Sequence, residues 1–266
     1  MSELLTWISW LLLPAFLVLD LAFRARRYPA PRGWRLRALL LTAAAFYFSL
    51  KVGEGWAAVL PASTLLDLSG LGTWWGGLVG ILVYELFHYG YHRAAHEWGW
   101  LWRASHQMHH AAESLDAFGA WLLHPIDVVA FTTIGILVSF PLLGLTPEAG
   151  GLMGAFLAFN AMFQHANLRT PRWLGFLIQR PESHGVHHGR GVHAFNYSDL
   201  PVWDMVFGTF RNPARFEGEV GLWPGASSRV GDLLLGRDVA AMAPPGAGAP
   251  ARTRRSATAS RASIPA

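Results

Sequence analysis

Two histidine triplets with the same spacing are the residues of this chain best suited to chemistry. All 12 histidines lie between residues 88 and 193, and two groups repeat the pattern His-x-x-His-His. Residues three and four apart are neighbours on a helix surface, so each triplet would crowd its imidazoles onto one turn. Neutral imidazole is the commonest metal ligand at neutral pH. These residues are therefore candidate metal ligands: His106, His109, His110, His184, His187 and His188.

A further pair, His92 and His96, is spaced one helical turn apart and could grip an ion from one helix face. Together with the triplets it gives eight imidazoles, whereas a tetrahedral zinc site takes only about four ligands. We therefore expect two ions. The His-Glu-x-x-His signature of zinc proteases is absent. A ferritin-like site would need a second Glu-x-x-His beside that of Glu85 and His88, and the chain has none.

The composition narrows the class of protein further. Of 266 residues, 52% are hydrophobic and only 14% are charged, whereas soluble domains carry about 25% charged residues. The absence of cysteine excludes disulfides, iron–sulfur clusters and thiolate-ligated haem. The net charge of +4 comes mainly from arginines in residues 24–37 and 252–261. We interpret these as membrane-orienting and lipid-contacting residues and expect no nucleic-acid partner.

The apolar stretches predict an all-α integral-membrane helical bundle with about four to five membrane segments and a helical cap carrying the histidines. We expect residues 36–60 to form either one interrupted crossing or a short span followed by an interfacial helix. Prolines and glycines between the last two stretches predict a helical hairpin. The candidate stretches are residues 4–23, 36–60, 74–87, 128–145 and 149–163.

Charge and hydropathy also predict which side of the membrane carries the histidines. The positive-inside rule places the basic loop of residues 24–37 in the cytoplasm. Counting crossings from there brings every histidine segment to the cytoplasmic face of a bacterial-type inner membrane. We expect N-terminal membrane segments and the basic loop in residues 1–70, a catalytic domain in residues 71–216, and a C-terminal extension in residues 217–266. The extension is expected to be disordered from about residue 242, where the composition cannot support a core.

The spaced motifs resemble those of the fatty acid hydroxylase and sterol desaturase superfamily. They are HRAAH, LWRASHQMHH, HGVHH, FNY and WDMVFGTF, and the resemblance covers roughly residues 75–212. Members of this superfamily are integral-membrane enzymes with a histidine-ligated di-iron centre. The resemblance implies that the eight histidines above bind metal, and that His165, in FQHANL, joins them.

Four further residues are candidates for an extra ligand or for orienting the ligands. His124, followed by Pro125, resembles a motif that supports the ligands or faces the substrate in this superfamily, and it is carried over weakly. Many bacterial relatives have Asp at the position of His88, which is interpreted as a supporting or core residue and not as a ligand. Asn196 and Asp204 could accept the free N–H of a ligating imidazole, or could serve a turn and a helix cap. His193 is interpreted as a loop residue. The tryptophans at positions 98, 100 and 102 are interpreted as an interfacial anchor.

The resemblance implies a di-iron oxidoreductase that uses O₂ as co-substrate to hydroxylate or desaturate a lipid. Electrons would come from an external donor, a ferredoxin or a cytochrome b5-type protein with its reductase, because the chain lacks a nucleotide motif and cysteine. A sterol, carotenoid, fatty acyl, sphingoid or alkylglycerol substrate all remain open. The alternatives are a non-oxidative metal-binding or transport protein and a zinc-dependent membrane hydrolase, since imidazole also suits zinc and copper.

Overall fold

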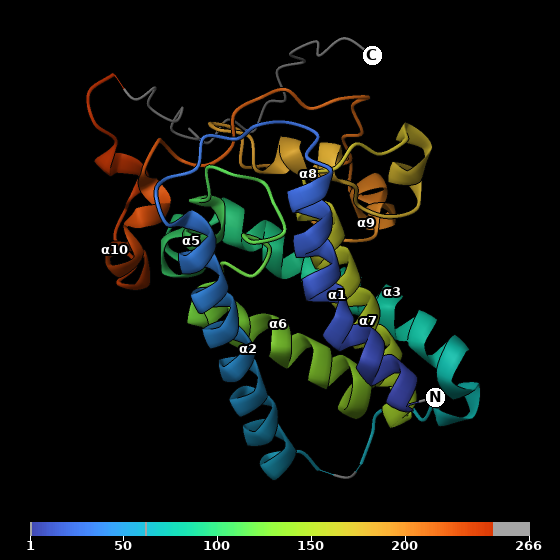
Figure 1. Ribbon diagram of the computed structural model, residues 1–266. Helices are drawn as coiled ribbons and strands as arrows, with labels where there is room; N and C mark the ends of the chain where they lie inside the picture. Colours follow the sequence, from blue (N-terminus) through green and yellow to red (C-terminus); the bar gives the residue numbers. More distant parts are fainter. Residues whose placement is uncertain (1, 62, 247–266) are drawn as a thin grey trace.

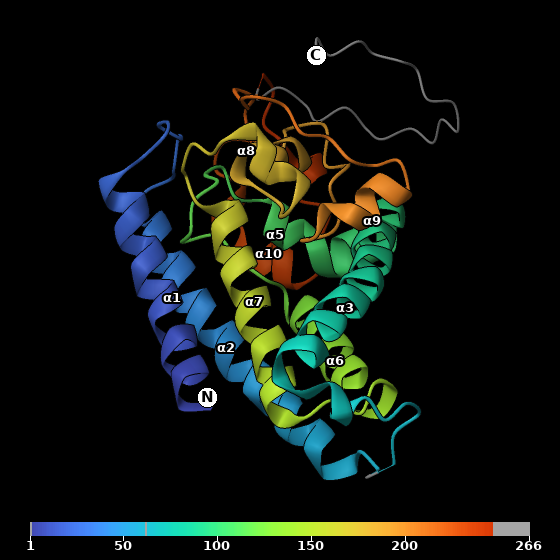
Figure 2. The same cartoon turned by 90° about the vertical axis from the view of Figure 1, so that its right-hand side faces the viewer.

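The computed structural model describes residues 2–61 and 63–246, and in this part of the chain the protein is all-helical without a β-strand. Five long helices run side by side, and shorter helices gather at one end of them (Figures 1 and 2). This confirms the predicted all-α class. The long helices are α1 (Ser2–Ala22), α2 (Trp34–Val59), α3 (Gly72–Glu97), α6 (Pro125–Leu137) and α7 (Pro147–His165).

The bundle has two distinct ends. At one end, the link between α2 and α3 bonds to the turn before α7, where Leu65 N donates to Pro141 O at 2.7 Å. At the other end, the basic loop after α1 contacts the end of α7, where Ala25 N donates to Asn167 O at 2.8 Å. The helices α6 and α7 are joined at the first end, but α7 packs mainly against α3 and α1, and α6 packs mainly against α2, so the expected hairpin is not a closely packed pair. The basic loop lies at the same end as the short helix α8 (Pro181–His187), as Figure 1 shows.

In the described part of the chain, three helical segments are long and apolar enough to cross a membrane: residues Trp34–Val59, Ser69–Glu97 and Pro125–Leu142. The first has a mean hydropathy of 1.4, and only 11% of that stretch is buried inside the protein. Such an apolar exterior favours contact with lipid. The helix α2 is continuous through Lys51 and Glu54, which form an exposed ion pair at 2.7 Å near its end. The total number of crossings remains a prediction.

Close packing of α3 against α7 fixes the position of the first histidines. A side-chain carbon added at Gly77 would lie 2.7 Å from Leu152 Cδ2, and one at Gly80 would lie 2.8 Å from Leu145 Cδ1. Small residues allow helices in apolar surroundings to approach closely. The last turns of α3, which carry His92 and His96, are thereby held against the other long helices.

The cap consists of short elements. Residues Trp102–His106 form a π-helical turn, η2, directly before α5 (Gln107–His110), and single π turns inside helices occur often at functional sites. Helix α8 begins at Pro181 and ends before Gly189, in line with the preference for proline in the first turn of a helix and glycine just after its end. The cap also contains α4 (Gly99–Leu101), η4 (Arg172–Phe176), α9 (Pro201–Val206), η5 (Ala226–Ser228), α10 (Val230–Leu234) and η6 (Ala240–Met242).

The chain after residue 217 packs on this cap. Leu222, Trp223 and Leu233 share a buried cluster with Met108 of α5. Glu113 accepts hydrogen bonds from the backbone N–H groups of residues 225 and 227. The predicted domain division itself is not tested by these contacts. Most of the tail expected to be disordered, residues 247–266, lies outside the described residues.

Candidate metal centre

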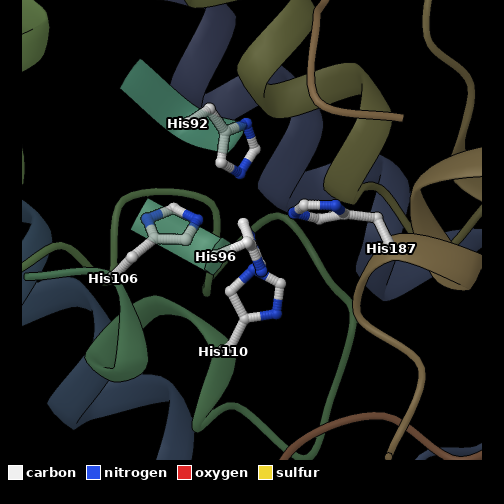
Figure 3. Close-up of side chains that lie close together, drawn as sticks. All are labelled: His92, His96, His106, His110 and His187. Atoms are coloured by element: carbon white, nitrogen blue, oxygen red, sulfur yellow. The ribbon is translucent and has the colours of Figure 1, made fainter. Parts of the chain in front are cut away.

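Five histidines from three segments converge at the cap. Each offers one ring nitrogen, and these nitrogens all lie within 4.8 Å of one another. Figure 3 shows the rings pointing toward a common space. The members of this first cluster are His92 and His96 of α3, His106 of η2, His110 of α5 and His187 of α8.

A second cluster of four buried histidines lies beside the first. Its members are His109, His165, His184 and His188, with one ring nitrogen of each within 4.8 Å of the others. His165 Nε2 lies 3.1 Å from His109 Nε2 and 3.0 Å from His184 Nε2. The ring of His110 in the first cluster stacks on that of His188 in the second, with centroids 4.1 Å apart, so the two clusters are in direct contact.

Each triplet divides between the clusters in the same way. The two residues four apart enter one cluster, and the middle residue enters the other. In the first triplet, His106 and His110 belong to the first cluster and His109 to the second. In the second triplet, His184 and His188 belong to the second cluster and His187 to the first. Adjacent positions on a helix point in different directions, whereas positions four apart lie on one face. The repeated spacing therefore supplies side chains to two neighbouring clusters.

Hydrogen bonds at Nδ1 orient several of these rings. His92 donates to Tyr197 O at 2.7 Å, and His187 donates to Phe195 O at 2.7 Å. His165 donates to Ala161 O at 2.7 Å. A neutral imidazole that donates from Nδ1 carries a free lone pair on Nε2, which is the atom that faces the cluster.

The remaining ring nitrogens test whether metal fits. Buried polar atoms are normally hydrogen-bonded. Among the described residues, however, both ring nitrogens of His96 and several buried Nε2 atoms lack a partner. An array of converging lone pairs is what a cation requires, so the residues fit a pair of metal ions. Besides His96, the histidines of the two clusters with a buried unpartnered Nε2 are His92, His106, His110, His187 and His188.

The electrostatics of the cap favour neutral imidazole. Burial, and then the neighbouring histidines, lowers the pKa of His109, His110, His184, His187 and His188 well below the usual value. Desolvation and like charge both disfavour the protonated ring. These side chains are therefore ready to coordinate at neutral pH without first losing a proton.

Asp127 is a candidate site residue that the sequence reasoning missed. It lies in the first turn of α6, fully buried, and accepts from His106 Nδ1 at 2.9 Å and from the Tyr91 hydroxyl at 2.7 Å. A carboxylate behind a ligating imidazole fixes its tautomer and increases its basicity. The available signal was an acidic residue at the start of an uncharged apolar stretch, which is a functional hint in membrane proteins.

Asn196 and Asp204 do not accept an imidazole N–H as the sequence suggested. Instead they hold the loop whose carbonyls do so. Asp204 accepts from Tyr197 N and Ser198 N, both at 2.9 Å. Asn196 donates to Ser183 O at 2.8 Å and accepts from the backbone of residue 211. Phe195 and Asn196 have φ angles of 69° and 50°, an uncommon conformation that is kept here by these bonds.

Two other candidate residues, His124 and His88, are not members of either histidine cluster. His124 caps α6: its Nδ1 accepts from Ile126 N at 3.1 Å, and its Nε2 donates to Leu234 O at 3.2 Å. It therefore lies outside both clusters. His88 contacts Glu85 instead, with His88 Nδ1 3.3 Å from Glu85 Oε2.

Two residues lie closer to the centre than their sequence interpretation suggested. His193 is in a loop as expected, yet its Nδ1 lies 3.0 Å from His110 Nδ1. Trp98 and Trp100 are exposed, whereas Trp102 packs against His96 and His110 with centroids 5.2 Å apart. Trp102 is thus a wall of the first cluster and not part of a surface anchor.

Comparison with known proteins identifies a family for the part of the chain that carries the histidines. The family model described as fatty acid hydroxylase matches residues 77–209, which contain all nine clustered histidines. No solved structure gives a significant match.

Curated relatives match about half of the chain. A very-long-chain aldehyde decarbonylase, GL1-9 of Oryza sativa subsp. indica, is 30% identical over 140 residues, covering 50% of this chain and 53% of the relative. Sphinganine C4-monooxygenase 1 of Arabidopsis thaliana is 26% identical, covering 50% and 53%. The ornithine lipid hydroxylase OlsE of Rhizobium tropici is 32% identical, covering 52% and 42%. The chain thus spans about half the length of these relatives.

Proposed function

Because the chain belongs to the fatty acid hydroxylase family, we propose that it is a membrane-bound oxidoreductase that hydroxylates or desaturates a lipid with O₂. The observation that carries the proposal is the pair of histidine clusters with converging, unpartnered ring nitrogens. Relatives named as a sphinganine monooxygenase and an ornithine lipid hydroxylase support lipid oxidation as the reaction class.

The proposed cofactor is a di-iron centre held by the nine clustered histidines. Imidazole also binds zinc and copper, so iron is proposed from the family and not from the ligand type. When bound, two irons would supply the reduction of O₂ and the removal of hydrogen from an unactivated C–H bond. Hydroxylation consumes two electrons and two protons per O₂ and releases water. The electrons are proposed to come from a ferredoxin or a cytochrome b5-type donor.

The residues of the chain would bind, orient and shield this centre. The carbonyls of residues 195 and 197 and the Asp127 carboxylate hold Nδ1–H groups, so that Nε2 faces the ions. The Asp127 charge also offsets part of the positive charge that neutral imidazoles leave uncompensated. Trp102 covers the first cluster against water. Side chains held in place in this way would need little reorganisation to bind the ions.

A lipid substrate and a cytoplasmic metal site are supported by the surroundings of the cap. The candidate spans expose large apolar side chains, including Leu36, Leu40 and Leu78, from which a lipid could approach the centre. The arginine-rich loop lies at the cap end of the bundle (Figure 2), and the positive-inside rule assigns such loops to the cytoplasm.

Lipid mass spectrometry with isotopically labelled O₂ tests the proposal. A host expressing the wild-type chain should contain a lipid that gains one labelled oxygen atom, or a lipid that loses two hydrogen atoms. The variant His187→Asn should abolish this product and lower the metal content. The matched control His124→Asn keeps a helix-capping side chain and should retain both. Bound zinc with lipid hydrolysis, or unchanged lipids with metal fully bound, would reject the oxygenase assignment.

A further inference from the structure

A third group of potential ligands lies outside both histidine clusters. Glu85 and His88 are one turn apart on α3, and Asp199 lies in the loop before α9. Each offers one ligand atom, and these atoms all lie within 4.8 Å of one another. Glu85 is 0% exposed, and Asp199 is 6% exposed. The group therefore places two carboxylates and an imidazole together in the protein interior.

The hydrogen bonds of this group leave one oxygen unused. Glu85 Oε2 accepts from Ser198 Oγ at 2.9 Å and from Asp199 N at 2.8 Å. Glu85 Oε1 is buried and has no hydrogen-bond partner among the described residues. The unpartnered Oε1 belongs to the carboxylate whose other oxygen makes these bonds. A buried carboxylate oxygen without a donor is costly unless a cation or a proton meets it.

The charge of the group is also incompletely balanced. Within the described residues, neither Glu85 nor Asp199 forms an ion pair with an arginine or a lysine, and His88 is the one basic side chain in contact. Burial, and then repulsion from Glu85, raises the pKa of Asp199. Two ionised carboxylates in one buried site repel each other unless a positive charge lies between them.

We propose that Glu85, His88 and Asp199 bind a third metal ion, a divalent transition cation, at a site separate from the two histidine clusters. Two carboxylates neutralise one divalent charge, and a mixed oxygen and nitrogen ligand set suits Mn²⁺, Fe²⁺ or Zn²⁺ better than a soft metal. The ring of His88 stacks on that of His92 with centroids 5.3 Å apart, so this ion would sit beside the first cluster.

The position of the site gives the ion a structural role. It joins α3 to the loop that carries the carbonyls of Phe195 and Tyr197, which accept from His187 and His92. Asp199 also binds this loop to α7, where Gln164 Nε2 donates to Asp199 Oδ1 at 2.8 Å. An ion here would clamp together the two elements that set the direction of these imidazoles.

Metal content of the purified full-length chain tests the proposal. Inductively coupled plasma mass spectrometry should find one metal equivalent fewer per chain in Asp199→Asn than in the wild type. The matched control Asp67→Asn changes an exposed carboxylate far from the cap and should match the wild type. The alternative is a protonated His88 between two carboxylates, which predicts equal metal content in all three proteins. That result would overturn the site.

A second variant distinguishes the loss of a ligand from a folding defect caused by Asp199→Asn. His88→Gln keeps a polar side chain of similar size and should also lose one equivalent. Titration of each protein with Mn²⁺, followed by electron paramagnetic resonance, should show one more bound Mn²⁺ per chain in the wild type than in either variant. Both readouts are differences between variants, so they hold whether the histidine clusters contain iron or zinc. Failure of lipid oxidation would therefore leave this test unaffected.

Discussion

The substitution Asp127→Asn tests the claim that an acidic partner behind His106 tunes the metal centre. The Asp127 carboxylate accepts two hydrogen bonds, from His106 Nδ1 and from the Tyr91 hydroxyl. Asparagine has nearly the same shape, but it has one acceptor oxygen and its amide donates. One of the two buried donors would then face an N–H group. The variant also removes a negative charge close to the proposed ions.

The expected loss can be estimated from the contacts. Removing the partner that orients a metal-binding histidine typically lowers metal affinity or activity by roughly 10–100-fold. This corresponds to about 1.4–2.7 kcal/mol, since about 1.4 kcal/mol is a factor of ten. A hydrogen bond to a charged group contributes about 1.5–3 kcal/mol, so one lost bond at His106 accounts for the whole effect. The loss should fall on the ion of the first cluster.

Competition with a chelator measures this loss. Wild type should release its two histidine-bound ions with similar difficulty, whereas Asp127→Asn should release one of them at a lower chelator concentration. The control Tyr91→Phe removes the other donor and leaves the carboxylate on His106, so its metal affinity should stay close to wild type. Unchanged metal affinity in a folded Asp127→Asn protein, or equal weakening of both ions, would refute the orienting role.

Three further predictions follow from the cap. Asp204→Ala removes the acceptor of two buried backbone N–H groups and should lower the free energy of unfolding by about 2–4 kcal/mol. The thermal unfolding transition in detergent should then occur at a lower temperature. An unchanged transition would contradict the role of Asp204 in holding the loop of residues 197 and 198. Gly221→Ala should also destabilise, because residue 221 has φ +85° and a side-chain carbon there would lie 2.8 Å from Ala112 O; the same melting assay checks it. The metal-free protein should lose stability as pH falls below about 6.5. The reason is that the cap histidines have lowered pKa values, so the unfolded chain binds more protons; a melting temperature independent of pH between neutrality and mild acidity would contradict it.

The sequence by itself determined the helices and the residues that gather at the cap. Apolar runs of membrane length, the proline at position 181 and the glycine at position 189 are local signals, so they predict helix positions without knowledge of the fold. The identical spacing of the two triplets is also local, because a helix converts positions four apart into one face. The prediction of a two-ion centre therefore needed no tertiary information.

Tertiary structure decided which group supports which imidazole. Asp127 lies 21 positions from His106, and Tyr197 lies 105 positions from His92, so neither partnership has a period that a sequence pattern can reveal. The carbonyl of Phe195 has no side-chain signature at all. The third group, with Glu85 and Asp199 separated by 114 positions, likewise exists only because α3 packs beside the loop before α9. Hydrogen bonding and coordination depend on distance in space, and for residues far apart in the chain only the packed fold sets that distance.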